Sequence, residues 1–264
     1  MEVREGDRVI LLDERGKKYL VRAERRVLHT DLGFLDLSDL LGKSFGEKVR
    51  SHLQKEFVIL RPRMSDLLQK IRRVPQVVLP KDAAQLVAHT GLGPGDLVVD
   101  GGTGSGALAL FMGHLVRPDG RVVSYEIRED FAEVARENIR LAGLEGVVEV
   151  KLRDIREGIE EREVDVVTLD LPCPEEVVPH AERALKPGGY LAVFTPTVDQ
   201  LQRLYPQLRR FGFAELRTLE CLVRDWEVRE GCTRPSTRML GHTCYLTVAR
   251  KAWPPETSPS PALP

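Results

Sequence analysis

The chain has 264 residues, of which 42% are hydrophobic and 30% charged, and its formal net charge at pH 7 is −1. This length suits one large and one small domain, and no apolar run approaches the roughly 18 residues of a membrane span. The opening residues 1–5 lack the apolar region of a signal peptide. We therefore expect a cytoplasmic protein without a membrane-spanning segment.

The amide and cysteine content bears on the source and the redox state. Asn138 is the one asparagine, and few amides beside many charges are typical of proteins from hot environments. Cys173, Cys221, Cys232 and Cys244 show no C-x-x-C spacing, so we expect no zinc site. Two alternatives stay open: buried thiols, or a disulfide between Cys221 and either Cys232 or Cys244.

Residues 1–62 are expected to form a small antiparallel β domain. Strand patterns occupy 7–13 and 17–22, on either side of a turn at 14–16, and two shorter ones occupy 28–31 and 56–60. This domain either contacts a partner or serves as a structural lid.

Residues 63–252 are expected to form the main domain. A helix with Ser65 as its N-cap would link the two domains, and a second helix over 81–89 opens after Pro80. From Leu97 onward, strand and helix patterns alternate, which predicts a parallel sheet covered by helices. Residues 253–264 hold five of the 17 prolines and are expected to form a disordered tail.

A glycine-rich turn follows the first strand of the main domain. The apolar run 97–99 ends on Asp100, and the glycines after it allow positive φ and a close approach of backbone N–H groups to a ligand. Gly102, Gly104 and Ala107 satisfy the G-x-G-x-x-A form of the dinucleotide fingerprint, with Glu126 as the ribose-binding acid. A nucleoside cofactor without a pyrophosphate, S-adenosylmethionine, requires the same features.

Later motifs decide between these cofactors. A strand over 147–152 leads to Asp154, a strand over 164–169 leads to Asp170, and residues 186–189 read Lys-Pro-Gly-Gly, with both glycines expected to cap a helix. Acids after three successive strands, followed by this turn, resemble the class I S-adenosylmethionine-dependent methyltransferases. That resemblance implies a Rossmann-like α/β fold with a mostly parallel seven-stranded sheet, and it disfavours a dehydrogenase.

The resemblance also assigns the cofactor contacts. Glu126 would bind the ribose hydroxyls and Asp154 the adenine amine, while Asp170 lies where the methyl group should point. Phe131 either covers the adenosine or belongs to the core. The turn that would line the methionine end consists of Gly102, Thr103, Gly104, Ser105, Gly106 and Ala107.

The last third of the domain narrows the family. Segments that resemble the tRNA (adenine-58-N1)-methyltransferases of the bacterial and archaeal type lie at 80–83, 170–174, 224–229, 234–235 and 238–243. The resemblance runs from about residue 61 to residue 251. It implies a homotetramer that methylates N1 of adenine 58 in tRNA, with adenine 57 as a further target in some archaeal members.

Two positions depart from that family pattern. Leu79 stands where a Tyr or His is common, and Glu175 follows Pro174 where a Pro-Trp pair is usual. Both lie near the expected entry of the target base. Whether position 57, 58 or both is methylated therefore stays open.

The chemistry of adenine N1 points to Asp170 as the catalytic residue. The base must be extruded from the folded RNA, and a carboxylate that accepts a hydrogen bond from its exocyclic amine would stabilise the positive charge that develops. The residues expected to contact the substrate are Leu79, Lys81, Arg224, Trp226 and Arg229. Trp226 fits a subunit interface equally well.

A net charge of −1 requires that a tRNA-binding protein segregate its charges. Basic residues gather in three blocks: Arg61, Arg63, Lys70, Arg72, Arg73 and Lys81; Arg203, Arg209 and Arg210; and Arg224, Arg229, Arg234 and Arg238. Solvated helix faces balanced by acids are the alternative for each block. Two other functions remain as rivals: a small-molecule methyltransferase of the corrin type and a non-catalytic RNA-binding subunit.

Overall fold

The computed structural model describes residues 1–74 and 77–254. The chain divides into two compact units, Met1–Ile71 and Arg72–Pro264. The first unit therefore ends after Ile71 rather than after residue 62. The reason is that helix α1 (Met64–Lys70) packs on strand β2, where Lys18 Nζ donates a hydrogen bond of 2.6 Å to Asp66.

The small unit is an antiparallel β domain, as predicted. Its main sheet has the order β2-β1-β6-β5, and a separate hairpin pairs β3 with β4. Alternating side chains of β1 and β6 point inward, so Val9, Leu11, Phe57 and Ile59 form a core that excludes solvent. The strands are β1 (Arg8–Asp13), β2 (Lys18–Arg22), β3 (Val27–Thr30), β4 (Gly33–Asp36), β5 (Lys48–Arg50) and β6 (Glu56–Leu60).

The predicted N-cap of the linking helix was wrong. Arg63, not Ser65, occupies the N-cap position of α1, and its backbone N–H donates to the carboxylate of Asp66 at 2.9 Å. An acid three residues into the helix thus satisfies a backbone donor that precedes the first turn.

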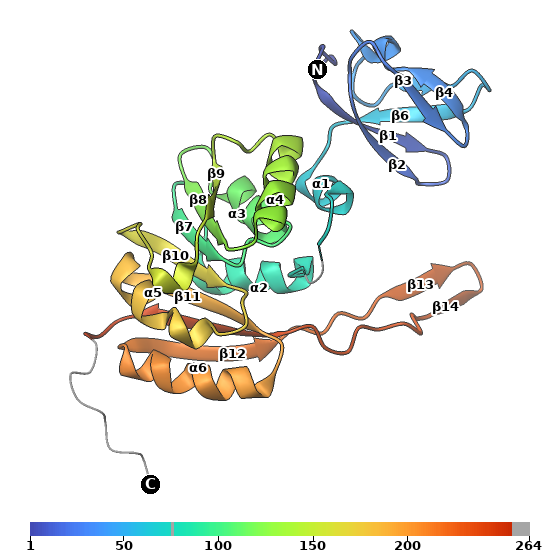
Figure 1. Ribbon diagram of the computed structural model, residues 1–264. Helices are drawn as coiled ribbons and strands as arrows, with labels where there is room; N and C mark the ends of the chain where they lie inside the picture. The colour runs from blue at the N-terminus through green and yellow to red at the C-terminus, as the bar shows by residue number, and fades with distance from the viewer. Residues whose placement is uncertain (75–76, 255–264) are drawn as a thin grey trace. The chain divides into compact units, whose positions relative to one another are not determined.

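The large unit is built on a seven-stranded sheet with the order β12-β15-β11-β10-β7-β8-β9 (Figure 1). The five strands from β11 to β9 pair in parallel, whereas β15 pairs antiparallel with both β11 and β12. The prediction of a mostly parallel sheet is confirmed. The strands are β7 (Leu97–Gly101), β8 (Arg121–Glu126), β9 (Val148–Leu152), β10 (Val164–Leu169), β11 (Leu185–Thr195), β12 (Phe213–Glu220) and β15 (Tyr245–Lys251).

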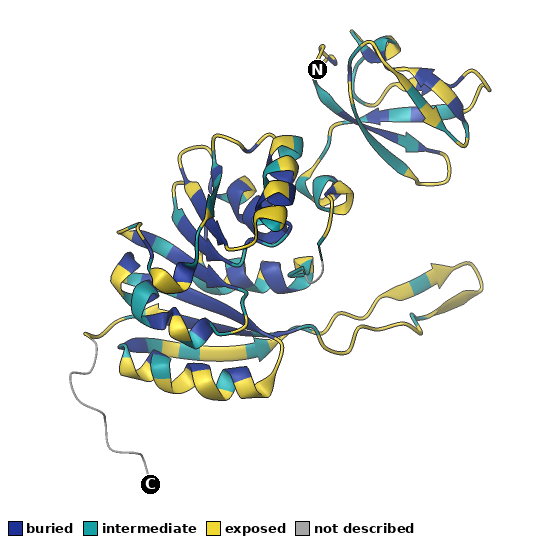
Figure 2. Cartoon of the chain, in the orientation of Figure 1, coloured by how far each residue is buried: buried dark blue, intermediate teal, exposed yellow. Residues whose placement is uncertain are grey.

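Helices cover this sheet, and its strands are the most buried part of the unit (Figure 2). In α4, Val134, Ala135 and Ile139 are buried, whereas Phe131 and Leu141 are half-buried. The helices are α2 (Pro80–Thr90), α3 (Ala107–Leu115), α4 (Glu129–Ala142), α5 (Val178–Ala184) and α6 (Val198–Arg210), with 3-10 turns η1 (Leu37–Leu40), η2 (Ile155–Glu157) and η3 (Pro174–Glu176).

Gly188 and Gly189 do not cap a helix, contrary to expectation. Helix α5 ends at Ala184 with Leu185 as its C-cap, and both glycines lie within β11, where its register with β10 shifts. Gly188 adopts a φ of +82°, and a Cβ on Gly189 would lie 3.0 Å from the carbonyl oxygen of Asp165. The glycines therefore allow a bulge against the neighbouring strand.

Strands β12 and β15 are connected through a two-stranded hairpin. The hairpin pairs β13 (Trp226–Arg229) with β14 (Cys232–Pro235) and extends away from the sheet (Figure 1). After β15, the backbone N–H of Trp253 bonds the carbonyl oxygen of Gly212 at 2.9 Å, and residues 255–264 of the predicted tail lie outside the described part. Within residues 1–74 and 77–254, no helix has the length and hydropathy to cross a bilayer.

Candidate active site

A pocket of about 440 Å³ opens at the carboxyl ends of β7, β8, β9 and β10. This is the edge where ligands bind in open parallel sheets, and the volume lies within the range of about 300–1,000 Å³ that is usual for ligand sites. The pocket is lined by Gly102, Gly104, Tyr125, Glu126, Ile127, Arg128, Phe131, Arg153, Asp154, Ile155, Arg156, Asp170, Leu171, Pro172 and Cys173. Six of the predicted site residues thus share one cavity.

The glycine-rich turn closes tightly on its neighbours. Gly102 has a φ of +91°, and a Cβ on it would overlap the carbonyl oxygen of Asp170. The N–H of Asp170 in turn donates to the carbonyl oxygen of Gly101 at 2.8 Å. Any larger residue at position 102 would therefore push apart the two loops that line the pocket.

A buried hydroxyl network supports this turn from below. The carboxylate of Asp100 accepts hydrogen bonds of 2.6 Å from both Ser124 and Thr168, and the Ser124 hydroxyl also lies 2.6 Å from that of Thr103. Burial raises the pKa of Asp100 to about 6, although these two hydrogen bonds oppose the shift. Thr103 therefore braces the turn through its side chain.

Glu126 holds the turn from the side of β8. One carboxylate oxygen accepts from the N–H of Gly104 at 2.8 Å, and the other accepts from Ile127 and Arg128 at 2.9 and 3.0 Å. The residue is 7% exposed and still lines the pocket. Because two carboxylate oxygens offer about four acceptor positions, capacity for a ligand hydroxyl remains.

Asp154 lies in the pocket wall and is already engaged. Its carboxylate accepts the backbone N–H and the guanidinium of Arg156, with four contacts between 2.7 and 3.0 Å. The guanidinium lowers the pKa of Asp154. These contacts occupy its acceptor positions, so a ligand amine could bind it only if Arg156 gave one up.

Phe131 contributes an apolar wall. It is half-buried in the pocket rather than part of the core, and the guanidinium of Arg128 lies 3.6 Å from its ring centroid. The adjacent Ile127 is 61% exposed. Together, these side chains supply the flat and apolar surface that a purine requires.

Asp170 follows β10 and faces the same cavity. Its carboxylate accepts no hydrogen bond from any described residue, unlike those of Glu126 and Asp154. Burial, and secondarily the charge of Asp100, raises the pKa of Asp170 to about 6. An unpartnered, largely ionised carboxylate at neutral pH is suited to accept a hydrogen bond from a ligand.

Helix α6 fixes the loop that carries Asp170. The Gln200 amide donates to the carbonyl oxygen of Pro172 at 2.9 Å, and the Arg203 guanidinium donates to Glu175 at 2.6 Å. Glu175, which departs from the family pattern, therefore anchors the loop. Its second oxygen is buried without a hydrogen-bond partner among the described residues.

Part of the predicted cofactor turn does not line the pocket. Ser105 and Gly106 are buried, and the carbonyl oxygen of Ser105 accepts from the Asn138 amide at 2.8 Å. Gly106 is the N-cap of α3 and Ala107 its first residue. These residues hold the start of the helix in place, and the expected contact of their backbone with the cofactor stays a prediction.

The Lys81 side chain is engaged within the fold, and its expected role in substrate binding stays a prediction. Its Nζ is surrounded by Asp82 at 2.8 Å, the carbonyl oxygen of Cys221 at 2.6 Å and the hydroxyl of Thr243 at 2.6 Å. An ammonium has three donors, and all three are engaged. Thr243 also donates to Asp82 at 2.9 Å. The cluster joins α2 to both ends of the segment that carries the β13–β14 hairpin.

The other expected substrate residues lie outside the pocket. Leu79 is the half-buried N-cap of α2, while Arg224, Trp226 and Arg229 are exposed on or beside the β13–β14 hairpin. Trp226 is 60% exposed, and Arg229 lies 3.8 Å from Glu227. The structure therefore does not bring this group to the cavity that holds Asp170.

Several pocket residues were missed by sequence reasoning. Tyr125 and Ile127 flank Glu126, Arg153 precedes Asp154, and Arg156 lies two residues after it. Their signal was available, because residues next to the last position of a parallel strand share its rim. Their side chains belong to common types without a distinctive spacing, which is why no motif marked them.

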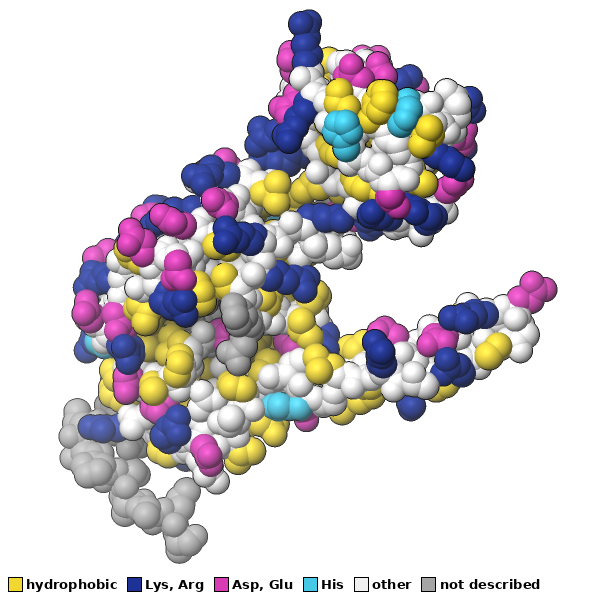
Figure 3. Space-filling model, turned by 45° about the vertical axis from the view of Figure 1, so that its right-hand side comes forward, with side chains coloured by type: hydrophobic (Ala, Val, Ile, Leu, Met, Phe, Trp, Pro, Cys, Tyr) yellow, Lys and Arg dark blue, Asp and Glu magenta, His cyan; other side chains and the backbone are white. Residues whose placement is uncertain are grey.

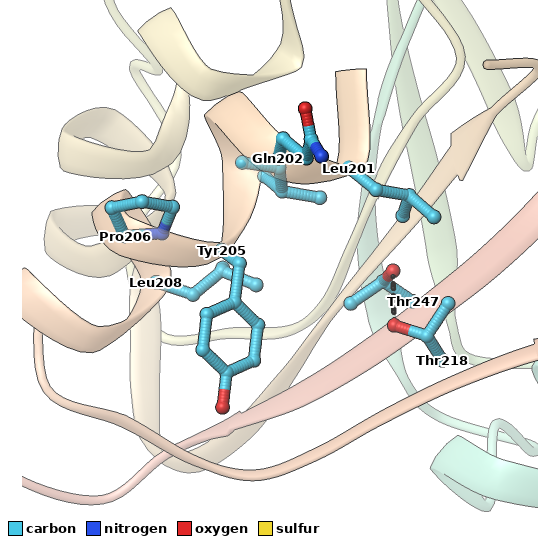
Figure 4. A pocket seen from close by; sticks show the side chains of 8 residues that line it. Leu201, Gln202, Tyr205, Pro206, Leu208, Thr218 and Thr247 are labelled. Carbon is cyan, nitrogen blue, oxygen red and sulfur yellow. Dashed lines mark hydrogen bonds between the residues drawn. The ribbon is translucent and has the colours of Figure 1, made fainter. Parts of the chain in front are cut away.

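A second cavity in the large unit lacks such chemistry. It measures about 390 Å³ and lies between α6 and strands β12 and β15 (Figure 4). The hydroxyls of Thr218 and Thr247 bond each other at 2.9 Å on its floor. No Asp, Glu, Lys, Arg or His lines it, since its lining consists of Leu201, Gln202, Leu204, Tyr205, Pro206, Leu208, Thr218 and Thr247.

All four cysteines are free thiols in the chain. Cys244 is buried, which raises its pKa to about 12, whereas Cys232 is exposed on the hairpin. Of the two open alternatives, the structure favours unpaired thiols within one chain.

Comparisons with known proteins agree with this geometry. A family model described as "tRNA methyltransferase complex GCD14 subunit" matches residues 67–232. The tRNA (adenine(57)-N(1)/adenine(58)-N(1))-methyltransferase TrmI of Methanocaldococcus jannaschii is 38% identical, with 94% of this chain and 95% of that protein covered. The tRNA (adenine(58)-N(1))-methyltransferase TrmI of Thermus thermophilus is 35% identical over 92% of this chain and 96% of its own length.

A solved structure extends the likeness to the fold. A protein described as a SAM-dependent O-methyltransferase from Thermotoga maritima superposes with a TM-score of 0.85 at 36% identity, covering 96% of both chains. The matched family model spans more than half of the sequence, and the relatives match it nearly end to end. The chain therefore belongs to the tRNA (adenine-58-N1)-methyltransferase family.

Proposed function

We propose that this protein transfers a methyl group from S-adenosylmethionine to N1 of adenine 58 in tRNA, with adenine 57 as a second position to be tested. The observation that carries the proposal is the meeting of Gly102, Glu126 and the unpartnered Asp170 in one pocket at the sheet edge. Family membership supports the acceptor, since the Methanocaldococcus relative is named for both positions.

The pocket fits the proposed cofactor chemically. Backbone at Gly102 and Gly104 is open on the pocket wall, Glu126 retains acceptor capacity for a ligand hydroxyl, and Ile127 and Phe131 provide apolar surface for a base. The cofactor, when bound, supplies an activated methyl carbon on a sulfonium. Glu126 would hold the ribose, and Asp154 would hold the adenine amine after Arg156 yields one contact.

Asp170 would act on the acceptor. Adenine N1 has an in-plane lone pair, so no deprotonation precedes the transfer. The Asp170 carboxylate would accept a hydrogen bond from the exocyclic amine, which orients the base and stabilises the positive charge that grows on it. Because its pKa is about 6, the carboxylate is mostly ionised at neutral pH.

A rigid loop is needed for this placement. Pro172 and Pro174 restrict the backbone after Asp170, and Gln200 and Arg203 tie the same loop to α6. Orientation of a reacting base within a fraction of an ångström contributes much of the acceleration in such transfers.

We also propose a homotetrameric assembly, as the family resemblance suggests. Strand β12 is an edge of the seven-stranded sheet, and an open edge pairs readily with another chain. Exposed apolar side chains follow it, at Leu222, Val223, Trp226 and Val228. Sedimentation velocity checks this point, since a monomer at micromolar concentration would contradict it. A tRNA substrate implies a cytoplasmic location, and the composition supports a thermophilic source.

The decisive experiment tests the methyl donor, the acceptor atom and the position in tRNA in one assay. Unmodified tRNA transcript is incubated with the protein and methyl-labelled S-adenosylmethionine, and digested nucleosides are assigned by position. We expect 1-methyladenosine at position 58. Transcripts with guanosine at 57, at 58 or at both then separate the two positions.

A negative result is equally informative. Label in a ribose or in a base other than adenine would overturn the proposed acceptor, and the Thermotoga relative named as an O-methyltransferase makes ribose methylation the specific rival to score. Absence of transfer to tRNA with bound cofactor would leave the small-molecule methyltransferase and the non-catalytic RNA-binding subunit as the remaining functions.

A further inference from the structure

One face of the small unit exposes rings that its own fold does not require. In the β3–β4 hairpin, Leu28 and Leu35 point to the core, so their neighbours Val27, His29 and Phe34 point outward. Phe34 is 44% exposed. Histidine and hydrophobic side chains gather on one face of this unit (Figure 3). An outward face of a small domain usually has polar residues, so this composition suggests a contact surface.

The rings are held in place by the backbone. Phe34 and His52 stack with centroids 3.9 Å apart and an interplanar angle of 12°. The N–H of Phe34 donates to His52 Nδ1 at 3.0 Å, and the N–H of His52 donates to the carbonyl oxygen of Phe34 at 3.1 Å. Two reciprocal hydrogen bonds thus fix the stack before any partner arrives.

Gly33 makes this arrangement sterically possible. Its φ is +102°, and a Cβ there would lie 2.7 Å from His52 Nδ1. The turn therefore leaves room for the imidazole to lie directly over the hairpin. His29, opposite Phe34 in the strand register, adds a third ring at 6.3 Å from the Phe34 centroid. We call His29, Phe34 and His52 the ring face.

The hydrogen bonds of His52 also determine which polar group the ring face presents to a partner. Because His52 Nδ1 accepts a hydrogen bond, the neutral ring has its proton on Nε2, and no described residue accepts from that nitrogen. The face therefore combines a flat stacking surface with a hydrogen-bond donor. Nucleobases present a π surface and ring acceptors, which match both features.

Charge favours a nucleic acid over a protein partner. The small unit, residues 1–71, contains 15 Lys and Arg against 12 Asp and Glu, a net of +3, while the rest of the chain has a net of −4. The small unit thus has the excess of basic residues that a tRNA-binding protein requires, and the rest of the chain has the excess of acidic residues. Arg25 and Arg26 are exposed immediately before Val27, at the start of the hairpin.

We propose that the ring face binds unpaired nucleobases of the tRNA substrate by stacking, at a site separate from the methyl-transfer pocket. The proposal rests on the proposed function for the identity of the RNA. Stacking on an aromatic side chain tolerates any base, because each base has a π surface. The ring face would therefore add affinity for tRNA without selecting a sequence.

A matched pair of substitutions tests the stacking. Phe34→Leu keeps an apolar side chain but removes the ring, whereas Phe34→Trp keeps a ring. With unmodified tRNA transcript, we expect the Leu variant to raise KM and the dissociation constant for tRNA about tenfold. The Trp variant should stay within twofold of wild type. For both variants, kcat at saturating tRNA and the affinity for S-adenosylmethionine should be unchanged.

Controls separate the ring face from other causes. Lys43→Gln removes one positive charge of the same unit, on a partly exposed side chain, and measures the general electrostatic contribution, which we expect to be less than twofold. Sedimentation velocity on each variant detects a changed subunit mass. Equal tRNA affinity of wild type and the Leu variant overturns the proposal, as does a Leu variant that dissociates the assembly, since the face would then be a subunit contact.

Failure of the proposed function is distinguishable from failure of this inference. If the wild type methylates no adenine in tRNA, the proposed function is wrong, and direct binding of the transcript by wild type and Phe34→Leu still decides whether the ring face contacts RNA. If methylation occurs and the two proteins bind tRNA equally, the ring face alone is refuted.

Discussion

The pocket of the large unit and the ring face of the small unit use side chains in opposite ways. Around the pocket, the informative groups are buried carboxylates, and burial raises the pKa values of Asp100 and Asp170 to about 6. On the ring face, the informative groups are exposed aromatic rings that are fixed by backbone hydrogen bonds. Chemistry on a small ligand requires low dielectric and defined atoms, whereas stacking requires an accessible plane.

This difference explains why one region has a sequence motif and the other has none. The turn around Gly102 must bring Glu126 and Asp170 to defined positions, and few residue types can do so. A stacking surface needs only rings of suitable size, which could stand at many positions. If the pocket depends on individual atoms, single substitutions of its carboxylates should have large effects, whereas exposed carboxylates nearby should tolerate the same change.

The largest expected effect is that of Asp170→Ala on the rate of methyl transfer. The rate of methyl transfer at saturating tRNA should fall about 10²- to 10³-fold, while the affinity for S-adenosylmethionine stays within a few-fold. Single-turnover kinetics and calorimetry measure the two quantities. Asp199→Asn, an exposed acid in the first turn of α6, is the matched control and should retain full activity.

Measurements of thermal stability distinguish a loss of catalysis in Asp170→Ala from a loss of folding. Because the pKa of Asp170 is raised in the folded protein, its ionised form opposes folding at pH 8. Removal of the carboxyl should therefore leave the melting temperature equal or higher. A lower melting temperature together with lost activity would mean that Asp170 is structural.

The second effect is on stability through Lys81. Lys81→Met leaves Asp82 and the carbonyl oxygen of Cys221 without their ammonium partner, at a cost of about 3 kcal/mol in the free energy of unfolding. Denaturant titration gives this value. Lys186→Met breaks a pair with Asp165 that is more accessible than the Lys81 cluster, with side chains 45% and 17% exposed, and should cost about 1 kcal/mol or less. Equal stability losses in the two variants would contradict a stabilising role of the Lys81 cluster.

The third effect is on cofactor affinity. Glu126→Gln should weaken binding of S-adenosylmethionine about 10- to 100-fold, since hydrogen bonds to a charged group are the stronger kind. Glu129→Gln, an exposed acid in the first turn of α4, should bind normally. Calorimetric titration compares the two variants. Wild-type affinity in Glu126→Gln would show that the ribose lies elsewhere.

The smallest effect is on the pH dependence. The pKa of Asp170 is about 6, so its carboxylate is protonated progressively as the pH falls through that value and cannot accept the amine hydrogen bond. The rate of transfer should fall about tenfold per pH unit below 6 and stay flat above 7. Asp170→Asn should abolish this dependence. A dependence that persists in that variant would assign it to another group, with Asp100 as the first candidate.

Much of the fold and part of the site could be predicted from the sequence. Glu126, Asp154 and Asp170 were recognised because each directly follows an apolar strand, and parallel strands bring their carboxyl ends to one edge. The small β domain and the mostly parallel sheet followed from local periodicity and turn residues. These are properties of contiguous segments, which a sequence displays without knowledge of distant contacts.

The tertiary structure decided what depends on residues far apart in the chain. Lys81 was expected to contact the substrate, and only the folded chain shows that its three donors bind Asp82, Cys221 and Thr243. Glu175 is an anchor only because Arg203 lies beside it. Phe34, in β4, and His52, which follows β5, form a stack although they lie 18 residues apart in the chain. Burial and partners determine the role of a charged or aromatic side chain, and both arise only when distant segments pack together.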